Sequence, residues 1–172
     1  RMLIAQVARL EAMGLTPMKA TELEFFLFEK SFDDIRRSGF RDLAPISGYN
    51  EDYNILQTSR EEHVMRPIRN HLVAAGVPVE NSKGEAETGQ EELNIRYADA
   101  IACADNHTIA KHAVKEIAQI NGHAATFMPK WRADKVGSAA HIHQSLFKGD
   151  TNIFHNADAP TTLSDPVNSH VP

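Results

Sequence analysis

The most informative part of this sequence is the run Thr21-Glu22-Leu23-Glu24-Phe25-Phe26-Leu27-Phe28. Its apolar residues alternate with the period of two that is typical of a β-strand, which places Leu23, Phe25 and Leu27 on one face. Glu22 and Glu24 share the opposite face because they are two residues apart. We therefore predict a strand over Thr21–Phe28 whose two carboxylates emerge side by side.

Carboxylates are rare in strands, and two of them on one face repel each other, the more so when they are buried. A bound divalent cation near Glu22 and Glu24 would remove both problems. The alternative is an edge strand whose polar face lies in water. The strand by itself leaves both interpretations open.

A second group of acidic residues lies further along the chain, at Glu80, Glu85, Glu87, Glu91 and Glu92. Glycines at positions 84 and 89 allow tight turns, so that Glu85 and Glu92 come together. If Gln90 to Arg96 is a strand, Glu92, Asn94 and Arg96 share one face. The alternative is a solvated acidic loop.

The third candidate is the stretch His141-Ile142-His143-Gln144-Ser145-Leu146. Alternation places His141, His143 and Ser145 on one face of a strand. The small residues Gly137-Ser138-Ala139-Ala140 before it permit a close approach of the backbone to a ligand. The other seven histidines form no such pattern, and we interpret them as structural.

The candidate carboxylates and imidazole indicate which kind of metal ion would bind. Several carboxylates and one imidazole form an oxygen-rich site, which suits Mg²⁺ or Mn²⁺ better than Zn²⁺. The sequence has neither the His-Glu-x-x-His pattern of zinc hydrolases nor a phosphate-binding loop of the Walker type.

Periodicity and stop signals predict helices over residues 1–14, 59–76 and 99–119, and strands over 21–28, 77–79, 89–97, 123–129 and 138–147. Ser59-Arg60-Glu61-Glu62 has the spacing of a capping box, and Pro67 predicts a kink or a later start of that helix. Strands are often neighbours in sequence. We therefore expect an α+β fold, a largely antiparallel sheet with flanking helices.

Composition bounds the class of protein. The chain has 172 residues, of which 42% are hydrophobic and 24% charged, with a formal charge of −5, as in ordinary globular proteins. Basic residues are not concentrated, and no apolar run reaches the roughly 20 residues that cross a bilayer, so we expect neither nucleic acid nor membrane as a partner. The single cysteine, Cys103, fits a reducing compartment, and we expect a cytoplasmic protein.

Together, these blocks resemble the glutamine synthetase catalytic domain. They are Thr21–Phe28, Val79-Glu80, Gly84-Glu85, Gly89–Glu92, His123–Lys130 and Gly137–Ser145, in the order and with nearly the spacing of that family, over roughly Met18 to Asn156. The resemblance implies an ATP-dependent ligase. In that family, ATP phosphorylates the γ-carboxylate of glutamate, and ammonia or another amine then displaces the phosphate.

The resemblance also implies residue roles, carried over by position. Glu24, Glu85 and Glu92 would hold one Mg²⁺ or Mn²⁺, and Glu22 and His141 a second one beside the ATP phosphates. Further matches are to nucleotide-contacting positions at Glu80, His143 and Ser145, and to a backbone contact to glutamate at Gly137. The resemblance assigns no further catalytic side chain to this chain.

The sequence also departs from the family pattern. Asn81-Ser82-Lys83-Gly84 stands where histidines are usual, Val136 replaces an asparagine, and Ala139 replaces a glycine. These changes point to an altered amine or amino-acid site rather than to an altered metal site.

We expect residues 1–172 to form part of a longer catalytic domain, without the family's small N-terminal domain and C-terminal half, and residues 166–172 to be a tail without a family match. The full-length family forms homo-oligomers, and the isolated chain is expected to be inactive. One alternative is a non-catalytic nucleotide- or metal-binding domain with a role in assembly or regulation. A weaker one is a hydrolase that uses Glu22 and Glu24.

Overall fold

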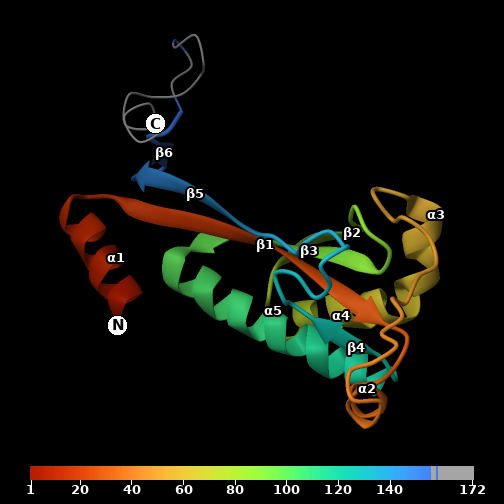
Figure 1. The fold of residues 1–172 in the computed structure, drawn as a ribbon. Helices are drawn as coiled ribbons and strands as arrows, with labels where there is room; N and C mark the ends of the chain where they lie inside the picture. The colour runs from red at the N-terminus through yellow and green to blue at the C-terminus, as the bar shows by residue number, and fades with distance from the viewer. Residues whose placement is uncertain (156–157, 159–172) are drawn as a thin grey trace. The chain divides into compact units, whose positions relative to one another are not determined.

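The computed structural model describes residues 1–155 and 158, so the expected tail at 166–172 lies outside the described residues. The helices are α1 (Met2–Ala12), α2 (Phe32–Arg37), α3 (Ile55–Thr58), α4 (Glu62–Ala74) and α5 (Ala100–Ile120), with a 3-10 turn at Ser59–Glu61. The strands are β1 (Thr16–Phe28), β2 (Val79–Gly84), β3 (Gln90–Asp99), β4 (Ala124–Thr126), β5 (Ala140–Lys148) and β6 (Thr151–Asn152) (Figure 1).

The strands follow the order β2-β3-β1-β5-β6, and β4 also pairs with β1. The pairs β2–β3, β1–β4 and β5–β6 are antiparallel. The expected α+β fold with a largely antiparallel sheet is therefore confirmed. The described residues divide into two compact units, a larger one of residues 21–96 and 106–141 and a smaller one that includes residues 1–20, 97–105 and 142–155.

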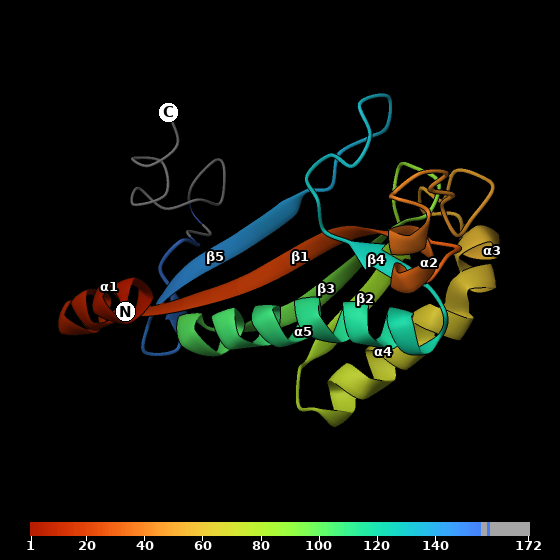
Figure 2. The ribbon, with the colours of Figure 1, turned by 60° about the horizontal axis from the view of Figure 1, so that its bottom comes forward.

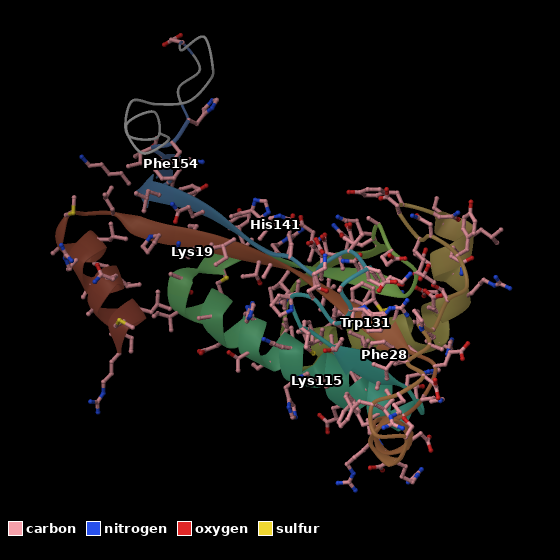
Figure 3. All side chains as sticks on the ribbon, in the orientation of Figure 1. Lys19, Phe28, Lys115, Trp131, His141 and Phe154 are labelled. Atoms are coloured by element: carbon pink, nitrogen blue, oxygen red, sulfur yellow. The ribbon has the colours of Figure 1, made fainter. Side chains whose placement is uncertain are left out.

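The core of the larger unit forms on both faces of β1, whereas the alternation predicts one apolar face with Leu23, Phe25 and Leu27. Phe25 and Leu27 are fully buried with Leu93 of β3 and with apolar side chains of α4 and α5. Phe26 and Phe28 are buried on the other face, where both pack edge-on against Trp131. Figure 2 shows α4 beside β2, and Figure 3 shows Trp131 next to Phe28. Core packing on both faces thus holds β1 in place next to Glu22 and Glu24.

The smaller unit contains α1, none of whose residues is buried. Its part of β1 is tied to β5 by a hydrogen bond of 2.7 Å from Lys19 Nζ to Gln144 Oε1. A turn at Lys148-Gly149-Asp150 closes the β5–β6 hairpin, with Gly149 at φ 58°. No helix among the described residues is both long and apolar enough to cross a membrane.

The predicted capping box is wrong. Asn54 already begins a helical segment, because its side chain accepts a hydrogen bond from Gln57 N. The Ser59 hydroxyl therefore lies within helical backbone and donates to Ile55 O at 2.6 Å instead of capping a new helix. Helix α4 begins at Glu62, and Pro67 lies inside it rather than in its first turn, so the proline does not delay the start of the helix.

Some strand boundaries also differ from those expected. Strand β1 begins at Thr16, five residues before the predicted start, and β2 covers 79–84 rather than 77–79. Residues 81–84, Asn-Ser-Lys-Gly, read as a glycine-containing loop, but they pair with residues 91–94 of β3. This pairing partner, rather than local propensity, makes the segment a strand.

Candidate metal centre

The first group of candidate ligands is Glu24, Glu85 and Glu92. One carboxylate oxygen of each lies within 4.8 Å of the others. Antiparallel pairing places Lys83 opposite Glu92 and Gly84 opposite Glu91, so the chain leaves β2 at Glu85 directly beside β3. Gly89 makes the return turn possible with φ 72°, where a side chain is disfavoured. The expected approach of Glu85 to Glu92 is therefore observed.

The second group combines Glu22, Glu92 and His141, again with ligand atoms within 4.8 Å of one another. His141 Nδ1 lies 3.2 Å from Glu22 Oε2, and Figure 3 shows His141 on β5. Glu92 belongs to both groups and is 2% exposed. One buried carboxylate thus joins the two sets of ligands that the sequence predicts separately.

Hydrogen bonds fix the orientation of Glu24. Its Oε2 accepts from Gln90 Nε2 at 2.8 Å and from the backbone N–H of Ala139 at 2.9 Å. The same Gln90 amide donates to Gly137 O at 3.1 Å. Gln90 thus ties the loop before β5 to the candidate ligands. This role of Gln90 was not predicted, although an uncharged polar residue among glutamates on a predicted strand was a usable signal.

Lys83 interacts directly with this group of carboxylates. Its Nζ lies 2.6 Å from Glu92 Oε1 and 3.2 Å from Glu85 Oε1, and Asn94 Nδ2 donates to the same Glu92 oxygen at 2.9 Å. Burial opposes the charged ammonium, but its bonds to Glu92 and Glu85 raise the pKa of Lys83. Lys83 is one of the departures from the family that we expected to alter the amine or amino-acid site, but its contacts are with two candidate metal ligands.

The pKa of Glu85 indicates that positive charge is favoured between the carboxylates of Glu24, Glu85 and Glu92. Burial raises the pKa of the Glu85 carboxyl, and although Lys83 opposes that rise, the charges of Glu92 and Glu24 add to it. Carboxylates this close together repel one another unless a cation or a proton lies between them. The donor set is hard and oxygen-rich, with one imidazole, and fits Mg²⁺ or Mn²⁺.

The remaining predicted site residues occupy distinct positions. Glu80 is exposed at a bulge in β2, where the pairing register shifts between Val79 and Asn81, and bulges often redirect a side chain. His143 and Ser145 alternate along β5 in the smaller unit. Gly137 lies so close to Pro129 that an added Cβ would be 2.7 Å from its carbonyl oxygen.

Comparison with known proteins identifies the family. The model of the glutamine synthetase catalytic domain matches residues 1–171. The chain belongs to the glutamine synthetase family.

Its relatives include several kinds of ligase. The chain is 40% identical over 145 residues to gamma-glutamylethanolamide synthetase of Streptomyces coelicolor, covering 84% of this chain and 31% of that protein. It is 38% identical over 171 residues to glutamine synthetase of Mycolicibacterium smegmatis, covering 96% of this chain and 36% of the relative. It is 34% identical over 160 residues to glutamate–isopropylamine ligase of a Pseudomonas species, covering 92% of this chain and 35% of that protein.

A solved structure of GmaS without ligand superposes with a TM-score of 0.81 at 30% identity, over 94% of this chain and 37% of that one. The matched part of GmaS thus shares the described fold. The chain spans about a third of the length of these curated relatives, 31 to 36%.

This glutamine synthetase family chain contains a third acidic group, of which the sequence indicates only Glu91. Glu51, Glu61 and Glu91 each offer an oxygen within 4.8 Å of the others, and each is at most 2% exposed. Gly89 N donates to Glu51 Oε1 at 2.5 Å, and the Ser47 hydroxyl donates to the same oxygen. Burial raises the pKa of Glu61 to about 8, and burial together with Glu61 and Glu51 raises the pKa of Glu91 well above its usual range. This group therefore retains protons near neutral pH.

A pH dependence of stability follows from Glu61. Because its pKa rises from 4.5 to about 8 on folding, the folded state binds more protons than the unfolded chain between these pH values. The contribution of Glu61 to the free energy of unfolding is fully present below pH 4.5 and falls as the pH rises to about 8. Relative to Glu61→Gln, the wild type should lose up to about 1.4 kcal/mol per pH unit in this window.

Urea denaturation at several pH values measures this slope. The control is Glu62→Gln, which removes the neighbouring acid, whose pKa is lowered mainly by its hydrogen bond to Arg69. That variant should keep the downward slope from pH 5 to 8. A slope unchanged by Glu61→Gln would contradict the assignment of the retained proton.

Proposed function

We propose that this protein is an ATP-dependent ligase that forms an amide from the γ-carboxylate of glutamate and ammonia or another amine, through γ-glutamyl phosphate. The observation that carries the proposal is the pair of ligand groups joined by Glu92, in a chain of the glutamine synthetase family. The curated relatives that support it are named as a glutamine synthetase and as ligases of ethanolamine and isopropylamine type.

The residues have separate roles in this proposal. Glu24, Glu85 and Glu92 hold one Mg²⁺ or Mn²⁺, while Glu22, His141 and the shared Glu92 hold the other. Bound divalent ions neutralise the charge on phosphate oxygens during transfer. Gln90 and the Ala139 N–H fix the Glu24 carboxylate, so that its geometry is set before substrate arrives.

Substrate contacts complete the proposal. Glu80, His143 and Ser145 contact the nucleotide, and the backbone at Gly137 contacts glutamate. The chain acts as part of a longer cytoplasmic polypeptide that forms a homo-oligomer. Other segments of that polypeptide complete the active site. The isolated 172-residue chain is therefore inactive.

The test is phosphate release from ATP by the full-length protein with glutamate, Mg²⁺ or Mn²⁺, and a panel of acceptors comprising ammonia, ethanolamine, isopropylamine and methylamine. Glutamate- and amine-dependent release, with the matching γ-glutamyl amide found by mass spectrometry, supports the proposal. ATP binding without turnover for every acceptor would instead identify a non-catalytic nucleotide-binding protein.

Lys83 should weaken the binding of metal ions. Its ammonium forms ion pairs with the same carboxylates that a divalent ion needs. The positive charges of the ammonium and of the metal ion repel each other at a few ångströms. Lys83→Met should therefore strengthen Mn²⁺ binding by about tenfold, equal to about 1.4 kcal/mol. Calorimetric titration with Mn²⁺ measures the change.

The matched control for that change is Lys135→Met. Lys135 makes a similar half-buried ion pair with Glu87, 3.0 Å long, and Glu87 belongs to neither ligand group. Its loss should leave Mn²⁺ affinity within about twofold of the wild type. Equal effects of both substitutions would show that only the net charge matters.

A further inference from the structure

Two histidines that the proposed ligase reaction does not use face each other in the larger unit. His63 lies near the start of α4, and His123 lies in the turn before β4. Their Nε2 atoms are 3.1 Å apart, their ring centroids 5.2 Å apart, and their planes inclined by 65°. The rings are therefore not stacked, and their ring nitrogens approach each other.

The backbone fixes the hydrogen on each ring. His63 Nδ1 lies 3.1 Å from Arg60 O, and His123 Nδ1 lies 3.1 Å from Phe28 O. A carbonyl oxygen can only accept, so each Nδ1 carries the hydrogen and donates it. In a neutral imidazole, the other nitrogen then presents a lone pair. Two Nε2 lone pairs consequently point at each other across 3.1 Å, an arrangement that requires a positive centre between them.

We propose that His63 and His123 form a binding site for a borderline transition-metal ion of the Zn²⁺ type, separate from the carboxylate centre. Two Zn–N bonds of about 2.0–2.1 Å at a tetrahedral angle place the nitrogens about 3.3–3.4 Å apart, and the observed distance is a few tenths of an ångström shorter. Histidines that bind metals usually donate their other N–H to a carboxylate or backbone carbonyl, as both rings do here.

The ligand chemistry separates this site from the proposed magnesium or manganese centre. Neutral imidazole nitrogens suit Zn²⁺, Ni²⁺ or Cu²⁺, whereas carboxylates suit Mg²⁺ and Mn²⁺. Among the described residues, no third histidine, cysteine or acidic side chain joins the pair in a three-residue group. His63 is exposed, so water can fill the remaining coordination positions. The ion would connect α4 to the end of β1, where the Phe28 carbonyl is the partner of His123.

The experiment is a calorimetric Zn²⁺ titration of the full-length protein in the Glu92→Gln background with excess Mg²⁺, which suppresses binding at the carboxylates. One Zn²⁺ should bind, and His63→Ala and His123→Ala should each raise its Kd by at least about tenfold. The matched control is His71→Ala, which removes an exposed histidine of the same helix whose Nδ1 bonds to Pro67 O. It should leave the Kd unchanged.

A second measurement covers the possibility that a variant folds poorly. Zn²⁺ should raise the melting temperature of the protein that keeps both histidines but not that of His63→Ala. Circular dichroism of each variant reports its fold. Zn²⁺ binding that is insensitive to both histidines overturns the proposal. So does an absence of Zn²⁺ binding, and nitrogen NMR would then show one proton shared between the two Nε2 atoms.

Discussion

Glu92→Gln should abolish both proposed metal sites at once. The carboxylate is shared by the group with Glu24 and Glu85 and by the group with Glu22 and His141. An amide keeps the shape and can still accept the hydrogen bonds of Lys83 and Asn94, so the fold should persist. It lacks the negative charge that a hard cation requires. We expect Mn²⁺ affinity to fall more than about 100-fold and kcat/KM about 10³-fold.

Two comparisons separate this result from a general loss of acidity. Glu87→Gln removes a carboxylate from the same turn between β2 and β3, but Glu87 pairs with Lys135 and lies in neither ligand group. It should retain near-normal Mn²⁺ binding. His141→Ala should weaken only one of two Mn²⁺ binding events, because the three-carboxylate group remains. Undiminished binding of both ions to Glu92→Gln would refute the shared-ligand arrangement.

Local pattern was sufficient to predict helix α5 and the part of β1 that carries Glu22 and Glu24. The alternation in residues 21–28 predicted both the burial of Phe25 and Leu27 and the common face of Glu22 and Glu24. Small residues and helix formers between positions 99 and 119 predicted α5, observed as Ala100–Ile120. These features depend on side-chain periodicity along one segment, which a single sequence contains.

Interactions between distant segments could not be predicted in the same way. Lys83 bonds to Glu92 only because β2 and β3 pair in a particular register. The group of Glu51, Glu61 and Glu91 brings together a loop, a 3-10 turn and a strand that are distant in the sequence, and only Glu91 belongs to an acidic group that the sequence indicates. The seven histidines interpreted as structural include His63 and His123, and nothing in their 60-residue separation indicates that their rings meet.

Gly137→Ala should reduce activity through the backbone rather than through any lost functional group. Its Cβ would lie 2.7 Å from Pro129 O, closer than Cβ atoms normally approach any atom. That oxygen cannot simply move away, because it accepts the Ser138 N–H at 2.9 Å. The loop must therefore shift, at a cost of about 1–3 kcal/mol in stability.

The shift would reach the proposed metal centre by two hydrogen bonds. Gly137 O accepts from Gln90, and Ala139 N, two residues later, donates to Glu24 Oε2. A displacement of about 1 Å at a reacting centre typically costs about 10²-fold in rate, which is the fall in kcat/KM that we expect. Gly48→Ala is the matched control, because no atom lies within 4 Å of its added Cβ. A Gly137→Ala enzyme with unchanged kcat/KM would show that this loop does not position Glu24. A fall confined to Gly137→Ala, with Gly48→Ala near the wild type, is the result that we expect.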